Sequence, residues 1–282
     1  MLIVRDSQVK KLFYKEQEID KILDWKGNVV FVKESAPTMT NYIKFTTSPS
    51  VASSNVFTVT YTDSTQDTLS YSEPSKEYTL SIPTDKVVNK IDFDNTMVDE
   101  VKVSCKINLS STFFTKKPKT IRFINCDATS STSLEYLFNG ATKTETIEMK
   151  NSDFSNVTNM SSMFYDCIKL TSLDLSNFNT SNVTNMGEMF EDCTKLTSLD
   201  LSNFNTSKVT DMGYMFCSCN NLTSLDLSGW DMTNVTYMTW MLNYSQKLKT
   251  IKMIGCNQTT IDKIKFELTD AGILNNVTIV TE

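Results

Sequence analysis

Three cysteines that recur every 26 residues are the first candidates for chemistry in this sequence. Cys167, Cys193 and Cys219 occupy one repeated position. A thiol can act as a nucleophile or bind a metal, but such roles need a neighbouring base or convergent ligands. The sequence contains no histidine, which removes the common Ser–His–Asp and Cys–His arrangements. We therefore interpret this column as small buried residues and predict no catalytic residue, metal site or cofactor.

Carboxylates recur with the same spacing as the cysteines. Glu148, Asp174, Asp200 and Asp226 each stand between two apolar residues of a short strand pattern. Because strand side chains alternate, the carboxylates should point outward, and stacking should align them. One interpretation is a solvated acidic face. The other is a ligand face, in which Ca²⁺ bridges successive carboxylates or a basic patch of a partner binds.

Serines precede these strands and should form a parallel column of hydroxyl groups. Such a column would add hydrogen bonds to a glycan or a polypeptide. A glycosidase needs two carboxylates in unlike environments, and a repeated column supplies equivalent ones, which disfavours a glycan-acting enzyme. The candidate binding residues are therefore Glu148, Asp174, Asp200, Asp226, Ser172, Ser198 and Ser224.

The elements that must position these columns form an internal repeat. Thr171–Thr180 returns as Thr197–Thr206 and, in part, as Thr223–Trp230, each time after 26 residues. A fixed period of this length predicts a solenoid, in which each coil buries its apolar face only against its neighbours. The expected strand cores are Ile121–Phe123, Ile147–Met149, Leu173–Leu175, Leu199–Leu201, Leu225–Leu227, Ile251–Met253 and Val277–Ile279.

A second element follows each loop of the repeat. Met160, Met163, Phe164 and Cys167 are spaced i, i+3, i+4, i+7, which indicates about two turns of helix with one buried face. The last coil differs, because Ile261–Leu268 reads as a more polar amphipathic helix. We expect this helix to cap the C-terminal end of the array.

The residues before the repeat show β periodicity. Runs rich in β-branched and aromatic residues are separated by Ser, Pro and Asp breaks, which is typical of a small antiparallel sandwich. We expect residues 1–35 to be an N-terminal β attachment segment, 36–119 a sandwich-like domain and solenoid cap, and 120–282 the solenoid. The main expected strands before the repeat are 41–46, 56–61, 68–71, 77–82, 90–93 and 100–103.

The repeated unit resembles a known family. Asn-Val-Thr-Asn-Met-x-x-Met-Phe-x-x-Cys-x-x-Leu-Thr-Ser-Leu-Asp-Leu-Ser, strongest in residues 157–180, 183–206 and 209–230, is similar to the BspA-like leucine-rich repeat of bacterial surface proteins. The resemblance implies a right-handed solenoid with a parallel β face that serves adhesion or protein binding, without catalytic residues. The expected fold is mainly β with short helices: an antiparallel N-terminal region followed by this solenoid.

Composition narrows the partners. The net charge is −6 and the only basic run is residues 116–119, which argues against nucleic acid as a partner. No run approaches 18 apolar residues, so no membrane insertion is expected. No apolar segment follows a basic start, and no anchor segment is recognised near the end, which together predict that the chain carries no export signal or anchor.

The opening Lys10–Ile22 is similar to short β-rich N-terminal segments of phage virion proteins. Together these features predict a non-enzymatic phage structural protein in the virion, a head or tail fibre or decoration component. Residues 1–35 would bind other virion proteins, and residues 120–282 would bind a host surface glycan or protein. A homo-oligomer is expected. The alternative is a bacterial surface or secreted adhesin.

Overall fold

The computed structural model describes residues 41–49, 51, 55–93, 98–114, 117–175 and 178–282, and the backbone of four short strands nearer the N-terminus. The chain divides into two compact units, residues 1–40 and 41–282. The strands of the first unit form two antiparallel pairs: β1 (Phe13–Tyr14) with β2 (Gln17–Glu18), and β3 (Lys21–Leu23) with β4 (Val29–Val32).

The second unit begins with two packed antiparallel layers. Phe45 of one layer stacks on Phe57 of the other at a centroid distance of 4.2 Å, and both side chains are buried. The strands lie where the β periodicity predicts them. One layer holds β5 (Tyr42–Thr47), β8 (Glu77–Ser81) and β10 (Val98–Ser104), and the other β6 (Asn55–Tyr61), β7 (Gln66–Tyr71) and β9 (Val88–Asp92).

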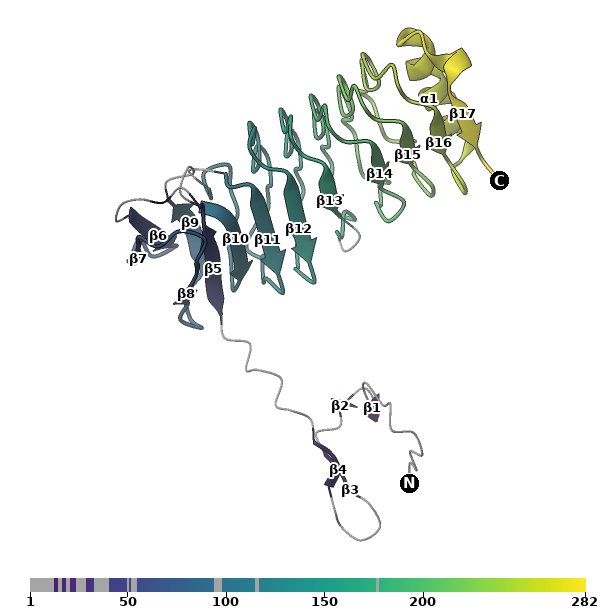
Figure 1. Cartoon of the computed structure of the whole chain (residues 1–282). Coiled ribbons are helices and arrows are strands. Elements are labelled where there is room, and N and C mark those ends of the chain that lie inside the picture. The colour runs from purple at the N-terminus through teal and green to yellow at the C-terminus, as the bar shows by residue number, and fades with distance from the viewer. Residues whose placement is uncertain are drawn as a thin grey trace. The chain divides into compact units, whose positions relative to one another are not determined.

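The repeat forms a β-solenoid whose strands lie side by side along one face (Figure 1). β10 pairs in parallel with the first coil's strand, so the sheet runs without a break across the expected boundary between residues 119 and 120. The antiparallel layers thereby cover the open end of the solenoid. The solenoid strands are β11 (Thr120–Ile124), β12 (Thr146–Lys150), β13 (Ser172–Asp174), β14 (Ser198–Asp200), β15 (Ser224–Asp226), β16 (Thr250–Lys252) and β17 (Thr278–Val280).

Columns of identical buried side chains fill the interior. The rings of Phe138, Phe164, Phe190 and Phe216 stack nearly parallel, with neighbouring centroids 5.4 to 5.6 Å apart. The methionines at the two repeated positions beside these rings are buried in nearly every coil. The prediction that the Met and Phe columns form the core is therefore confirmed, as is the mainly β solenoid fold with coils of about 26 residues.

The second element of each coil is a run of turns, which corrects the expectation of a short helix. Among the described residues, α1 (Gln258–Asp270) is the only α-helix. In the central coil, the N–H of Phe190 bonds the next coil's Met215 carbonyl at 2.9 Å, whereas the N–H of Cys193 bonds its own coil's Phe190 carbonyl at 3.1 Å. Donors thus alternate between the next coil and the carbonyl three residues back.

Left-handed backbone conformations make this alternation possible. Two residues per turn run have positive φ, as at Glu188 (φ 56°) and Asp192 (φ 58°). Each such residue donates its own N–H to the next coil. In an uninterrupted helix the same N–H would donate to the carbonyl four residues back. The apolar spacing of three and four residues is common to both structures, so the sequence pattern alone does not separate them.

The C-terminal cap matches its prediction. Asn257 accepts a hydrogen bond from the Thr260 N–H at 2.8 Å and so caps the start of α1. The helix ends beside Gly272, whose φ is +71°, and η1 (Leu274–Asn276) leads into β17. Ile264, Glu267 and Leu268 of α1 are buried, so the helix closes the last coil.

Candidate functional site

Strand pairing aligns the predicted binding residues in register. Glu148 is opposite Asp174 in the β12–β13 pair, and Asp200 is opposite Asp226 in the β14–β15 pair. β13 is the end strand of a six-stranded sheet and β14 the end strand of a four-stranded sheet. The carboxylates therefore form two neighbouring pairs on the strand face, in place of one continuous ladder.

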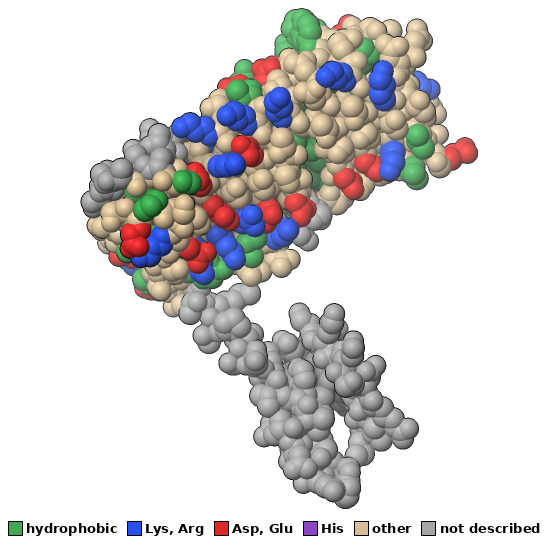
Figure 2. Space-filling model, viewed as in Figure 1, with side chains coloured by type: hydrophobic (Ala, Val, Ile, Leu, Met, Phe, Trp, Pro, Cys, Tyr) green, Lys and Arg blue, Asp and Glu red, His purple; other side chains and the backbone are tan. Residues whose placement is uncertain are grey.

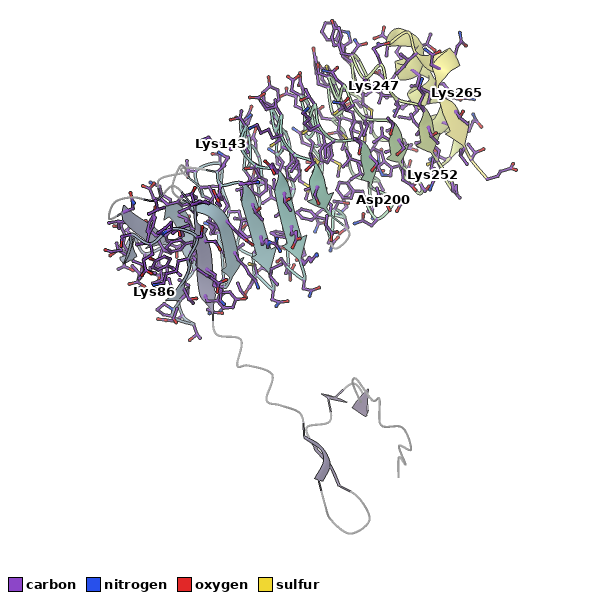
Figure 3. The ribbon with its side chains drawn as sticks, viewed as in Figure 1. Lys86, Lys143, Asp200, Lys247, Lys252 and Lys265 are labelled. Carbon is purple, nitrogen blue, oxygen red and sulfur yellow. The ribbon has the colours of Figure 1, made fainter. Side chains whose placement is uncertain are left out.

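Cations are interleaved with these carboxylates. Arg122 lies 3.4 Å from Glu148, and Lys150 lies 3.7 Å from Glu148 and 3.9 Å from Asp174. At the other end, Lys252 lies 3.5 Å from Asp226. Figure 2 shows acidic and basic side chains interspersed on the visible face, and Figure 3 shows Asp200 and Lys252 near the solenoid strands.

Local turns occupy two of the aspartates as well. Asp200 accepts hydrogen bonds from the Ser202 hydroxyl at 2.7 Å and the Ser202 N–H at 3.1 Å, which lower the pKa of its carboxyl group. Asp226 accepts from the Ser228 N–H at 3.1 Å. These are Asx turns, which shape the loop after each strand. Among the described residues, no group of three or more acidic or cysteine side chains is arranged to hold a metal ion.

The serine column is also in register. Ser172 pairs with Thr146, while Ser198, Ser224 and Thr250 pair in succession across the other sheet. Ser172 and Ser198 are exposed and Ser224 is half-buried. The strand face therefore offers rows of hydroxyl groups beside carboxylates, of which Glu148, Asp174 and Asp226 form salt bridges. A binding role for these columns stays a prediction.

The cysteine column has a structural role that spacing alone did not reveal. The thiols of Cys193 and Cys219 point at the carbonyls of Phe164 and Phe190, with sulfur–oxygen distances of 3.2 and 3.1 Å. Burial raises the pKa of both thiols, which makes them poor nucleophiles. Ser245 takes the same position one coil later and bonds in the same way.

Thiol reactivity should follow this burial. Of the seven cysteines, only Cys256 is partly exposed, so we expect a disulfide reagent to label Cys256 first in the folded protein. Cys167, Cys193 and Cys219 should react only as the protein unfolds, because each thiol is fully enclosed. Time-resolved labelling followed by peptide mass spectrometry measures the order. Labelling in guanidinium chloride, where all seven should react, is the control, and early labelling of any column cysteine would contradict the prediction.

A column of lysines on the loop before each strand escaped the sequence analysis. Lys143, Lys169, Lys195 and Lys247 share one repeated position and are exposed. None of the ion pairs found among the described residues includes them. Figure 3 labels Lys143 and Lys247 near the edge away from Asp200. Their 26-residue spacing could have identified this column from the sequence alone.

The turn edge carries a further feature, a cavity of about 360 Å³ that spans four successive coils. Its lining residues occupy two positions of the 26-residue repeat. The residue type at each of these positions changes from coil to coil, so the repeat pattern does not reveal them. They are Tyr136, Asn139, Tyr165, Glu188, Glu191 and Tyr214. Exposed aromatic side chains continue along the same edge at Tyr237, Trp240 and Tyr244.

The fold and these surfaces can be compared with known proteins. Residues 132–253 match the family model described as "Mycoplasma protein of unknown function, DUF285". No curated protein matches the chain. Among the described residues, no helix combines the length and apolar character needed to cross a membrane. The match covers the central coils, and together with the solenoid of 26-residue coils it fits a BspA-like repeat protein, a class compatible with a binding role at a surface.

Proposed function

We propose that this protein is a non-enzymatic binding protein displayed on a tailed phage, as a head or tail fibre or decoration component. The observation that carries the proposal is the solenoid, which presents outward side chains in register from coil to coil. Rows repeated at about 4.8 Å suit an extended ligand, such as a surface polysaccharide or a polypeptide. The exposed hydroxyls and lysines supply hydrogen bonds and charge along these rows.

The N-terminal unit supplies the attachment in this proposal. Residues 1–40 are compact by themselves, and their segment Lys10–Ile22 is similar to segments of virion proteins. This unit would bind other virion proteins, with the chain present as a homo-oligomer, while the solenoid contacts the host surface. Neither contact involves nucleic acid or insertion into a membrane.

Particle composition tests the proposal directly. We expect mass spectrometry of gradient-purified phage to find the protein in a fixed ratio to the capsid proteins. A chain lacking residues 1–40 should be absent from particles, although circular dichroism should show that its solenoid still folds. Absence of the full-length chain from particles would remove the virion assignment.

A bacterial surface or secreted adhesin is the second candidate. The match of residues 132–253 to a family described from Mycoplasma favours it. Digestion of intact cells with a protease separates the two candidates. Loss of the protein from protease-treated cells, with retention on untreated cells and without any copy in phage particles, would support the adhesin.

The absence of catalysis is part of the proposal. A glycosidase uses two carboxylates in unlike environments. Glu188 and Glu191 are the pair that comes nearest to this arrangement, because both line the turn-edge cavity and burial raises the pKa of Glu191 to about 7. We expect no release of reducing sugars from host polysaccharides. Hydrolysis that disappears in Glu191→Gln or in Asp200→Asn would overturn the non-enzymatic assignment.

A further inference from the structure

The turn-edge cavity combines aromatic walls with carboxylates. Tyr136 and Tyr214 lie three coils apart, which corresponds to roughly 14 Å at the spacing of paired strands. Tyr165, Glu188 and Glu191 come from the two coils between them. The lining residues other than Tyr136 are half-buried. A group bound in the cavity would therefore be partly shielded from water.

The charge in this space is uncompensated. Glu188 accepts a hydrogen bond from the Ser162 hydroxyl at 2.8 Å, whereas no hydrogen bond to the Glu191 carboxylate is found among the described residues. No lysine or arginine lines the cavity, and none of the ion pairs among the described residues includes either glutamate. The cavity therefore bears negative charge without a fixed counter-ion.

The surroundings of Glu191 strengthen this imbalance. Burial is the largest cause of its raised pKa, and the charges of Glu188 and Asp192 on the same turn add to it. Tyr165 faces Glu191 from the preceding coil, and Tyr214 and Cys217 face it from the following coil. A cation entering the cavity would relieve the repulsion among these groups.

We propose that this cavity binds the guanidinium group of an arginine side chain presented by a partner protein. Tyrosine faces attract cations and stack on the planar guanidinium, and a carboxylate accepts its paired N–H groups. Inorganic cations fit less well, because their sites need several convergent oxygen ligands, and no such group occurs among the described residues. A neutral sugar would leave the carboxylate repulsion in place.

The inference rests on the proposed function only in treating the solenoid as the binding part of the chain. It holds equally for a protein carried on a particle or on a cell. The test below measures binding to the cavity alone. Failure to bind arginine would not change the result of the particle experiment, and absence of the protein from particles would not change the arginine-binding result.

Calorimetric titration of the full chain tests the proposal, with acetyl-arginine amide as the probe and acetyl-citrulline amide as its neutral isostere. We expect arginine to bind on the order of tenfold more tightly than citrulline, as the loss of a charge-assisted contact implies. Glu191→Gln should weaken arginine binding by a similar factor. Glu77→Gln makes the same chemical change at an exposed residue of β8 that does not line the cavity. It should leave arginine binding unchanged and is the matched control.

The pH dependence gives a second readout. Because the pKa of Glu191 is about 7, arginine affinity should rise as the pH increases through that value, and this rise should vanish in Glu191→Gln. Equal affinity for the arginine and citrulline probes, or unchanged binding in Glu191→Gln, would overturn the proposal. So would a neutral oligosaccharide that binds with an affinity insensitive to Glu191→Gln but lost in Tyr165→Ala.

Discussion

Replacing Phe190 with alanine should lower the free energy of unfolding by about 3–5 kcal/mol. Phe190 is fully buried between Phe164 and Phe216, with ring centroids 5.5 and 5.6 Å away and interplanar angles of 5° and 3°. Strand pairing and the turn-edge hydrogen bonds fix the spacing between coils. The neighbouring rings therefore have little freedom to move into the space that the substitution leaves.

Urea denaturation followed by tryptophan fluorescence measures this loss, because Trp230 is buried in the same array. Phe190→Leu is the matched control: Leu242 occupies this column one coil beyond Phe216, so leucine should cost about 1–2 kcal/mol. Phe266→Ala removes an exposed ring, at 68% exposure, and should change stability by less than about 0.5 kcal/mol. A Phe190→Ala loss no greater than that of Phe266→Ala would show that the ring stack is not a main source of stability.

The same variant probes how the coils cooperate. Each coil contacts only its neighbours, so the stability of a solenoid depends on the interfaces between adjacent coils. A cavity at Phe190 weakens the interfaces on both of its sides. We expect the single transition of the parent to broaden, with a lower dependence of the unfolding free energy on urea, as the two halves of the array begin to unfold separately.

The strands and the core could be predicted from the sequence because both depend on rules that repeat. Leu199 and Leu225 pair in register, as the 26-residue period requires. Phe178, Phe204 and Trp230 also recur with this period, and each is at most 3% exposed. Burial of an apolar column is the same physical requirement in every coil, so a single repeat predicts its neighbours.

The local backbone of the turn edge was not predictable in this way. Positive φ at Glu188 and Tyr214 is an uncommon conformation for residues with a Cβ. The hydrogen bonds to the following coil sustain it, and these bonds exist only once the coils have stacked. Sequence patterns report which residues are buried, and they carry little information about which carbonyl each N–H will reach.

The candidate sites also combine features that follow from the 26-residue period with features that do not. The aligned positions of Glu148 and Asp174 follow from the period, but their pairing with Lys150 does not, because Lys150 is two residues beyond the repeated column. Strand alternation would have indicated it, since residues two apart share a face. The cavity residues at 188 and 191 differ between coils, so a period-based reading passes over them.

Glu267→Gln should stabilise the protein by about 2 kcal/mol at neutral and alkaline pH. Glu267 lies on α1, is only 3% exposed, and accepts a hydrogen bond from the Met241 N–H at 3.0 Å. Burial raises the pKa of this carboxyl to about 7, which the hydrogen bond from Met241 only partly offsets. Above about pH 7 the folded protein must keep the ionised Glu267 carboxylate in a buried, poorly solvated environment. Glutamine retains the acceptor oxygen and carries no charge.

The sign of the pH dependence follows from the two states of Glu267. In the unfolded chain its pKa is near the ordinary value of about 4.3, so between that pH and about 7 the folded state holds a proton that the unfolded state has released. The contribution of Glu267 to stability therefore falls as the pH rises through this window. Below it both states are protonated, and the difference between Glu267→Gln and the parent should disappear.

Paired denaturation curves at several pH values measure this difference and cancel the titration of all other groups. Asp262→Asn removes an exposed carboxylate from the same helix that is not among the causes of the raised Glu267 pKa, and it should change stability by less than about 0.5 kcal/mol at every pH. A gain in Glu267→Gln that is independent of pH would assign the effect to packing, and a loss would mean that the ionised carboxylate stabilises the cap. A gain confined to pH values above about 4.3 would establish that the buried charge on α1 limits the stability of the C-terminal cap.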